Sequence, residues 1–154
     1  MPGFTILVPY NFTRQDQKAL DFLIRTFTHL PHTDITLYHG YTPVPDIPLR
    51  DNPIMEKVRG NLNYLNQTIK DQQTSLESAK AYLVEQGFVP DRIHTLFKPR
   101  KKDIAAEIIE LAKERLFDVI IVNHNPGKVT RFFSGSVFNK LVQAIRETAV
   151  CVVS

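Results

Sequence analysis

The stretch FDVIIVNHNPGKVTRFFSGSV, residues 117–137, joins an apolar run, a polar loop and a second segment with apolar periodicity. Val119–Val122 predict a strand buried on both faces, because four β-branched residues in succession suit a parallel sheet. The loop that follows holds Asn, His, Pro and Gly, and Gly135-Ser136 then opens a helical pattern. These parts form either an anion or nucleotide site or an ordinary strand-to-helix connection.

Strand and helix signals alternate on both sides of this stretch. Short apolar strands are expected at Phe4–Pro9, Asp34–His39, Arg92–Phe97, Val119–Val122 and Ala149–Val153. Helices are expected between them, with N-caps at Asn11 or Thr13, at Asp103 and at Ser136. The alternation predicts one α/β domain, residues 1–154, with an open, mostly parallel sheet and helices on both faces.

The longest periodic segment predicts a helix of about eight turns that ends near Gly87. Its apolar residues follow a three-four spacing at Met55, Val58, Leu62, Leu65, Ile69, Leu76, Ala79 and Leu83. The preceding segment, Gly40–Pro53, holds four prolines and is expected to be an extended loop. The long helix packs on the sheet or, alternatively, on a partner helix.

Composition limits the classes of function. The chain has 154 residues, a formal charge of +3 and a single cysteine, Cys151, which fits a reducing cytoplasm. No apolar run is long enough for a membrane span, and the N-terminus is expected to be a first strand rather than a signal peptide. The basic run Lys98–Lys102 is short and is typical of a solvated loop, so nucleic-acid binding is not favoured.

No catalytic residues and no metal ligands are predicted. His124 lies in the polar loop without a carboxylate or serine placed to complete a relay, and His39 is expected to be structural. The other histidines lack metal-ligand spacing. Cys151 is expected to be a buried, inert thiol, and Phe132-Phe133 a core or interface pair.

Three segments resemble the universal stress protein family, and together they span nearly the whole chain. ILVPYNFT at residues 6–13 resembles the first strand and turn, and DIAAEIIELAKERLFDVIIV at 103–122 resembles the third helix and fourth strand. Gly135-Ser136-Val137, followed by a helix and a strand, resembles the end of the domain. The resemblance implies a Rossmann-like fold of the adenine nucleotide alpha hydrolase type, with strand order 3-2-1-4-5.

The resemblance also implies a homodimer formed through the C-terminal strand and, in some members, binding of ATP with Mg²⁺. The ATP-binding members carry G-x2-G-x9-G-[ST] after the fourth strand and an Asp after the first. Alignment on Gly135-Ser136 places Val122 and Asn125 at the first two glycines and Asn11 at the Asp. The site residues that this comparison implies are Pro9, Asn11, Gly40, Asn125, Gly127, Lys128, Arg131, Gly135, Ser136 and Val137.

These departures have physical consequences. Val122 resists positive φ and adds bulk, whereas Asn125 tolerates the left-handed region. Asn11 keeps an acceptor but loses the charge. The sequence is therefore interpreted as a cytoplasmic, dimeric stress-response protein that acts by binding, with a weak or altered nucleotide or anion site. The alternatives are an ATP-binding member with a phosphate loop rebuilt through Gly127, Lys128 and Arg131, and a polyanion-binding or protein-interaction module.

Overall fold

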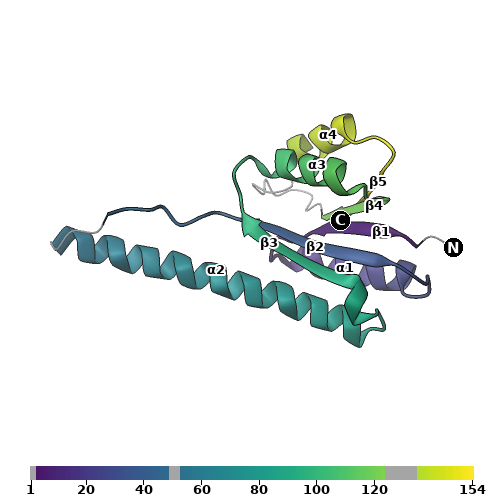
Figure 1. Ribbon diagram of the computed structural model, residues 1–154, viewed down its shortest axis with the longest axis horizontal. Coiled ribbons are helices and arrows are strands. Elements are labelled where there is room, and N and C mark those ends of the chain that lie inside the picture. Colours follow the sequence, from purple (N-terminus) through teal and green to yellow (C-terminus); the bar gives the residue numbers. More distant parts are fainter. Residues whose placement is uncertain (1–2, 49–52, 124–134) are drawn as a thin grey trace.

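A five-stranded parallel sheet organises the chain in a computed structural model, which describes residues 3–48, 53–123 and 135–154 (Figure 1). The strands are β1 (Thr5–Pro9), β2 (Asp34–Tyr41), β3 (Ile93–Pro99), β4 (Val119–Asn123) and β5 (Ala149–Val153). The helices are α1 (Arg14–Phe27), α2 (Pro53–Glu85), α3 (Ile104–Arg115) and α4 (Gly135–Ala144), and a 3₁₀ turn spans Pro90–Arg92. The order β3-β2-β1-β4-β5 confirms the predicted topology.

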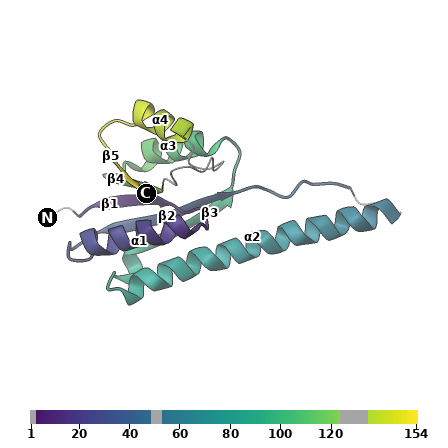
Figure 2. The same ribbon diagram turned by 180° about the vertical axis from the view of Figure 1, so that it is seen from behind.

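Two hydrophobic cores lie on opposite faces of the sheet. Helices α1 and α2 cover one face, and α3 and α4 cover the other (Figure 2). Strand β1 supplies both cores, because Ile6 and Val8 point to the first face and Leu7 to the second. Both β1 and β4 are buried almost throughout, which is what the near-continuous apolar runs in their sequences predict.

Helix ends follow the predicted cap chemistry. The side chain of Asp103 accepts a hydrogen bond of 2.9 Å from the backbone N–H of Ala106 and so caps α3. Beyond the end of α2, Gly87 has a φ of +117°, a conformation that side-chain-bearing residues rarely adopt. Leu116 continues the three-four spacing of Ala105, Ile109 and Ala112, which predicts that it lies on the same face of α3, and this prediction is wrong. Its φ is +52° and its side chain is 77% exposed, because the helix has already ended there.

Three further expectations need correction. Strand β2 continues through Gly40 and Tyr41, since these residues pair with Lys98 and Pro99 of β3. Helix α4 begins at Gly135, one residue before the expected cap, so Ser136 lies within its first turn. Cys151 is half-buried rather than fully buried, because β5 forms an edge of the sheet.

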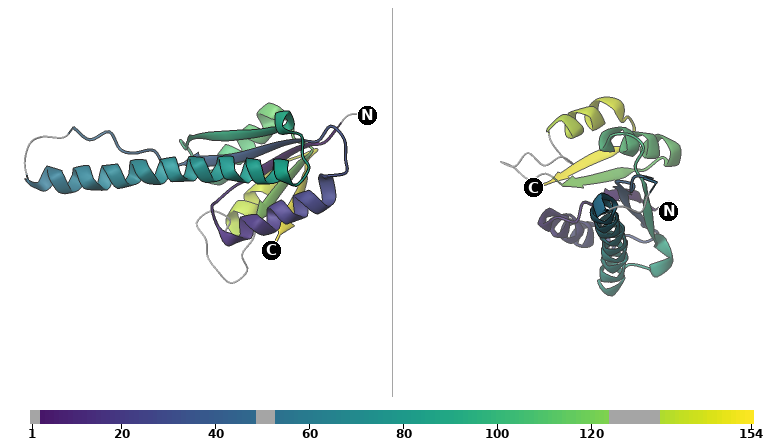
Figure 3. Two further views of the ribbon diagram at one scale, coloured as in Figure 1. Left: turned by 90° about the horizontal axis from the view of Figure 1, so that it is seen from below. Right: turned by 90° about the vertical axis from the view of Figure 1, so that its left-hand side faces the viewer.

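Helix α2 packs on the sheet over only part of its length. Leu76, Ala79 and Leu83 are its buried residues, and all three lie in its C-terminal third. The N-terminal part continues past the carboxyl ends of the strands, with residues 42–48 running alongside it (Figure 3). The expectation of sheet packing is therefore correct for the C-terminal part of the helix and wrong for the N-terminal part.

None of the helices in the described ranges is long and apolar enough to cross a membrane.

The unequal packing of α2 predicts unequal costs for one substitution. Leu76→Ala should lower the free energy of unfolding by about 2–5 kcal/mol, because it empties a fully buried site. Leu65→Ala, in the same helix, should cost well under half of that, since its side chain is 41% exposed. Urea unfolding of both variants measures the difference, and equal costs would contradict the packing described above.

Candidate functional site

The turn between β1 and α1 lies at the carboxyl edge of the sheet, where doubly wound folds bind ligands. Strand β1 ends at Pro9, and Phe12 then takes a φ of +61°, which is uncommon for a residue with a bulky side chain. Thr13 is the N-cap of α1. The neighbouring strand β4 ends at Asn123, directly beside this turn in the sheet order.

Asp16 joins these two strand ends. Its carboxylate accepts hydrogen bonds from the backbone N–H groups of Thr13, at 2.8 Å, and Asn11, at 3.2 Å. It also accepts one from the side-chain amide of Asn123. Asp16 is only 1% exposed. One buried carboxylate thus fixes the β1–α1 turn to the end of β4.

Burial raises the pKa of Asp16 from 3.8 to about 6. The hydrogen bonds from Thr13, Asn11, Phe12 and Asn123 act in the opposite direction, because they favour the charged form. The amide oxygen of Asn123 is buried and has no hydrogen-bond partner among the described residues. The strand ends therefore hold one titratable carboxyl and one unused acceptor.

A small cavity of about 10 Å³ lies at the carboxyl ends of β1 and β2. Its lining residues are Pro9, Tyr10, Asn11, Tyr38, His39, Gly40 and Ile104. The cavity is small because the Tyr38 side chain lies over Gly40: a Cβ built on Gly40 would come within 2.7 Å of the Tyr38 hydroxyl oxygen. The space that remains is about the size of one water molecule.

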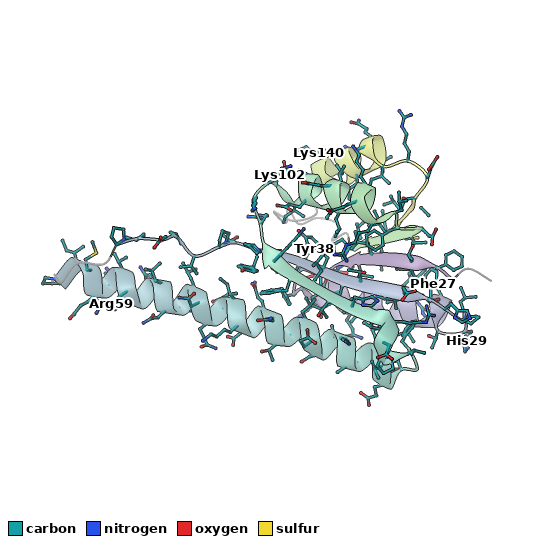
Figure 4. All side chains as sticks on the ribbon, viewed as in Figure 1. Phe27, His29, Tyr38, Arg59, Lys102 and Lys140 are labelled. Atoms are coloured by element: carbon teal, nitrogen blue, oxygen red, sulfur yellow. The ribbon has the colours of Figure 1, made fainter. Side chains whose placement is uncertain are left out.

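Tyr38 is held in this position by its surroundings. It is buried in the core beneath α3, and the Lys98 ammonium lies 5.8 Å from the centre of its ring. Figure 4 shows Tyr38 at the end of the sheet, below the start of α3, where Lys102 is labelled. Burial, together with the charge of Glu107, raises the pKa of Tyr38 to about 12, so its hydroxyl stays protonated at neutral pH.

On the other face of the sheet, the same strand ends carry a chain of aromatic rings. The ring of Phe12 meets that of His39 edge-on at 4.6 Å, and Phe97 stacks on Tyr41 at 4.7 Å. The Nδ1 atom of His39 lies 2.8 Å from the carbonyl oxygen of Tyr10. Burial lowers the pKa of His39, and so does the charge of Arg100. His39 is thus a buried, neutral member of the core at pH 7.

The structure brings three of the predicted site residues together. Pro9, Asn11 and Gly40 all line the small cavity. Gly135, Ser136 and Val137 form the start of α4. The remaining predicted residues, Asn125, Gly127, Lys128 and Arg131, lie outside the described residues, as do His124 and Phe132-Phe133.

Sequence reasoning missed Asp16, Tyr38 and Asn123. A signal for Asp16 was present, because Thr13-x-x-Asp16 resembles a capping box, in which the acidic side chain reaches back to the N-cap amide. Nothing in the local sequence indicated that the ring of Tyr38 would lie over Gly40.

The basic run Lys98–Lys102 is engaged within the chain. The Lys102 ammonium pairs with Glu110 at 3.0 Å, and the Arg100 guanidinium donates to the Thr42 hydroxyl at 3.4 Å. Two backbone N–H groups of the run donate to the carboxylate of Glu107. Within the described part of the chain, no group of three or more His, Cys, Asp or Glu residues could hold a metal ion.

A larger cavity, of about 490 Å³, lies at the opposite end of the sheet. Phe117, Asp118, Ile145 and Thr148 are among its lining residues, so it is located where β4 and β5 begin. Size alone favours it as a binding site. Its position does not, because ligands of doubly wound folds bind where the strands end.

Parallel strands in the order 3-2-1-4-5, with helices on both faces, define a doubly wound α/β domain. The sequence model of the universal stress protein family matches residues 4–152. The chain belongs to the universal stress protein family.

Solved structures share this fold at low sequence identity. The hypothetical protein MJ0577 superposes with a TM-score of 0.70 at 21% identity, over 99% of this chain and 96% of that one. A universal stress protein from Archaeoglobus fulgidus in complex with dAMP gives 0.60 at 15% identity, over the whole of both chains. A universal stress protein in complex with cAMP gives 0.58 at 16% identity, over 99% and 98%. A search of curated protein sequences found no match.

The raised pKa of Asp16 predicts a pH-dependent stability. In the unfolded chain the carboxyl ionises near pH 3.8, but in the folded chain it ionises only near pH 6. The contribution of Asp16 to the free energy of unfolding should therefore decrease by up to about 3 kcal/mol as pH rises from about 4 to about 6, and then stay constant. Urea unfolding across this range, together with carboxyl-carbon NMR of Asp16, measures the effect.

Asp16→Asn should remove this pH dependence. Asp21→Asn, on the exposed side of the same helix, is the matched control and should retain it. An Asp16 carboxyl that titrates near pH 4 would contradict the prediction.

Proposed function

We propose that this chain acts by binding rather than by catalysis, through a weak or altered adenine nucleotide site at the carboxyl ends of β1, β2 and β4. Pro9, Asn11 and Gly40 would contact the nucleoside, and the start of α4 at Gly135-Ser136 would receive the phosphates with the loop residues Asn125, Gly127, Lys128 and Arg131. A helix N-terminus suits phosphate because its N–H groups are unpaired and its dipole is positive there. The proposed setting is a cytoplasmic homodimer with a role in the stress response.

The observation that carries this proposal is the cavity bounded by Pro9, Asn11 and Gly40. It lies at the end of the sheet that doubly wound folds use for ligands. Two proteins of the same fold have been solved with dAMP and with cAMP, which supports an adenine nucleotide as the ligand class.

The position of Tyr38 supports weak rather than tight binding. A cavity of about 10 Å³ does not admit a purine base, so Tyr38 has to move before a base can lie against Gly40. Moving the ring breaks its packing under α3 and its contact with Lys98. That cost is subtracted from the free energy of binding.

ATP with Mg²⁺ is the alternative ligand, held by a phosphate loop rebuilt through Gly127, Lys128 and Arg131. The weak or altered site and the site with a rebuilt loop differ in their affinity for ATP. Calorimetric titration with ATP and Mg²⁺ separates them. The polyanion alternative receives less support, because Arg100 and Lys102 already have partners within the chain.

We also propose that β5 forms the homodimer. It is an edge strand of sequence AVCVV, and Val152 is 44% exposed. The opposite edge strand, β3, carries His94, Lys98 and Pro99, which discourage strand pairing. Strand β5 has no such residue, so it is the edge suited to pair with a second copy.

Replacing Tyr38 tests the nucleotide site. Tyr38→Leu keeps an apolar side chain in the core but removes the ring from above Gly40. The affinity of this variant for dAMP, cAMP or ATP with Mg²⁺ should be about tenfold higher than that of the wild type. This corresponds to about 1.4 kcal/mol of binding free energy. Isothermal titration calorimetry measures this, with the thermal midpoint of each variant as the check on folding.

Tyr82→Leu, a partly buried tyrosine of α2, is the matched control and should leave affinity unchanged. Gly135→Leu should weaken binding, because it adds a side chain where the phosphates would approach. Affinity that is equal in the Tyr38 variant and the wild type would contradict the blocked site. Submicromolar ATP affinity in the wild type would instead favour the rebuilt loop.

A charge on β5 tests the dimer. Val152→Lys should weaken dimerisation and give monomer at low micromolar concentration, because pairing through β5 would bury an unpaired ammonium. Val89→Lys, at a valine that is 55% exposed and precedes β3, should leave dimerisation unchanged. Sedimentation velocity over a series of concentrations gives the dissociation constant of each variant, and a dissociation constant that Val152→Lys leaves unchanged would rule out this interface.

A further inference from the structure

Helix α2 extends far beyond the sheet that it packs on. Figures 1, 2 and 3 all show its N-terminal part projecting past the carboxyl ends of β2 and β3. Upstream of Leu76 no residue of the helix is fully buried. We call the part formed by residues 53–72 the arm; in Figure 4, Arg59 is labelled on it, well away from the sheet.

The apolar stripe that packs on the sheet continues along the arm. Leu76, Ala79 and Leu83 form its buried end. In the arm, the same three-four spacing continues through Met55, Val58, Leu62, Leu65 and Ile69. Beside the stripe, Ile54 is 77% exposed. The core-facing side of the helix therefore extends beyond the sheet, where residues 42–48 run alongside it and Leu65 is still 41% exposed.

The arm lacks the features that stabilise a solvated helix. Between Arg59 and Lys70 it has no charged residue, so it gains no ion pairs from one turn to the next. Asn61, Asn63 and Asn66 are weak helix formers. Gly60 costs a further ~1 kcal/mol relative to alanine, although a Cβ there would meet nothing within 4 Å. A helix of this composition needs packing along its apolar face.

We propose that the arm pairs antiparallel with the arm of a second copy of this chain. The stripe is self-complementary in that direction. When Leu62 lies against Leu65 of the second copy, Val58 lies against Ile69, and the remaining contacts repeat by symmetry. Antiparallel pairing also places each sheet beyond the tip of the other arm, whereas parallel pairing would bring both sheets to the same end.

The charges along the arm allow two identical helices to meet. The positions that flank the stripe are Arg59, Asn61, Asn66 and Thr68, so the only charge near the seam is Arg59. In the antiparallel register Arg59 faces Asn66 of the second copy, and no like charges oppose each other there. The other charged residues of the arm, Glu56, Lys57, Lys70 and Asp71, lie on the far side of the helix wheel.

The experiment separates arm pairing from pairing through β5. In a Val152→Lys background any β5 contact is lost, so a concentration-dependent dimer in sedimentation velocity reports on the arm alone. Adding Leu62→Glu and Leu65→Glu should convert that dimer to monomer. The thermal midpoint should change little, because neither residue is in the core. A matched control with Asn63→Glu and Gln67→Glu, on the outer side of the arm, should remain dimeric.

Distances between spin labels test the antiparallel register of the two arms. Spin labels at Asn63 should lie within about 20 Å of each other across an antiparallel pair, since residue 63 then lies at the same height along the pair as residue 64 of the second copy. Labels at Lys57 should be farther apart than those at Asn63. A monomeric Val152→Lys parent at several hundred micromolar overturns the proposal and leaves the stripe to a different protein. A dimer unaffected by the two glutamates overturns it as well.

Discussion

Strand β1 lies at the centre of the sheet, and an aspartate satisfies the backbone at each of its ends. At the amino end, the Asp118 carboxylate accepts hydrogen bonds from the N–H and the hydroxyl of Thr5. At the carboxyl end, Asp16 accepts from the turn that leads into α1 and from the end of β4. Residues 6–9 of β1 are buried, and the side chains of Asp118 and Asp16 fix where the strand begins and ends. The positions of β2 and β4 follow from that.

The contacts of Asp16 have a chemical consequence for the carboxyl end of the sheet. A carboxylate that serves two backbone amides and one side-chain amide has little capacity left for a ligand. A nucleotide bound there would be recognised by neighbouring groups, namely the amide oxygen of Asn123, which has no partner among the described residues, and the backbone around Pro9 and Gly40. The proposed nucleoside contacts of this chain therefore depend on backbone shape and neutral groups more than on charge.

The sequence predicted the elements well, because Val119–Val122 and Phe4–Pro9 are continuous apolar runs whose burial needs helices on both faces. The strand order was implied by the family resemblance. The sequence predicted less well wherever tertiary contacts decide the outcome. Leu116 continues a helical spacing but follows a helix that has already ended, and Leu65 belongs to a stripe whose sheet stops short of it. The periodicity of a helix indicates which of its sides is apolar. It does not indicate how far the sheet that packs on that side extends.

The candidate site was predictable to the extent that it depends on local chain geometry. Pro9, Asn11 and Gly40 lie at or near the carboxyl ends of β1 and β2, and parallel strands bring these ends to one edge of the sheet. Tyr38 was not predictable, because its orientation depends on the absence of a side chain at Gly40 and on Lys98 from the neighbouring strand. Such a contact joins two strands and a helix, and no single segment of sequence contains it.

The proline-rich segment before α2, residues 42–48, limits how far the helix can extend from the sheet. We call this segment the strut. Residues 42–48 form neither helix nor strand, and Pro43, Pro45 and Pro48 favour an extended backbone. At about 3.1 Å per residue this segment covers about 22 Å, which equals the rise of about 14 helical residues. The outward and returning parts of the connection must match in length for β3 to reach its place beside β2. Insertions in the strut and in the helix are therefore expected to be tolerated only in proportion to one another.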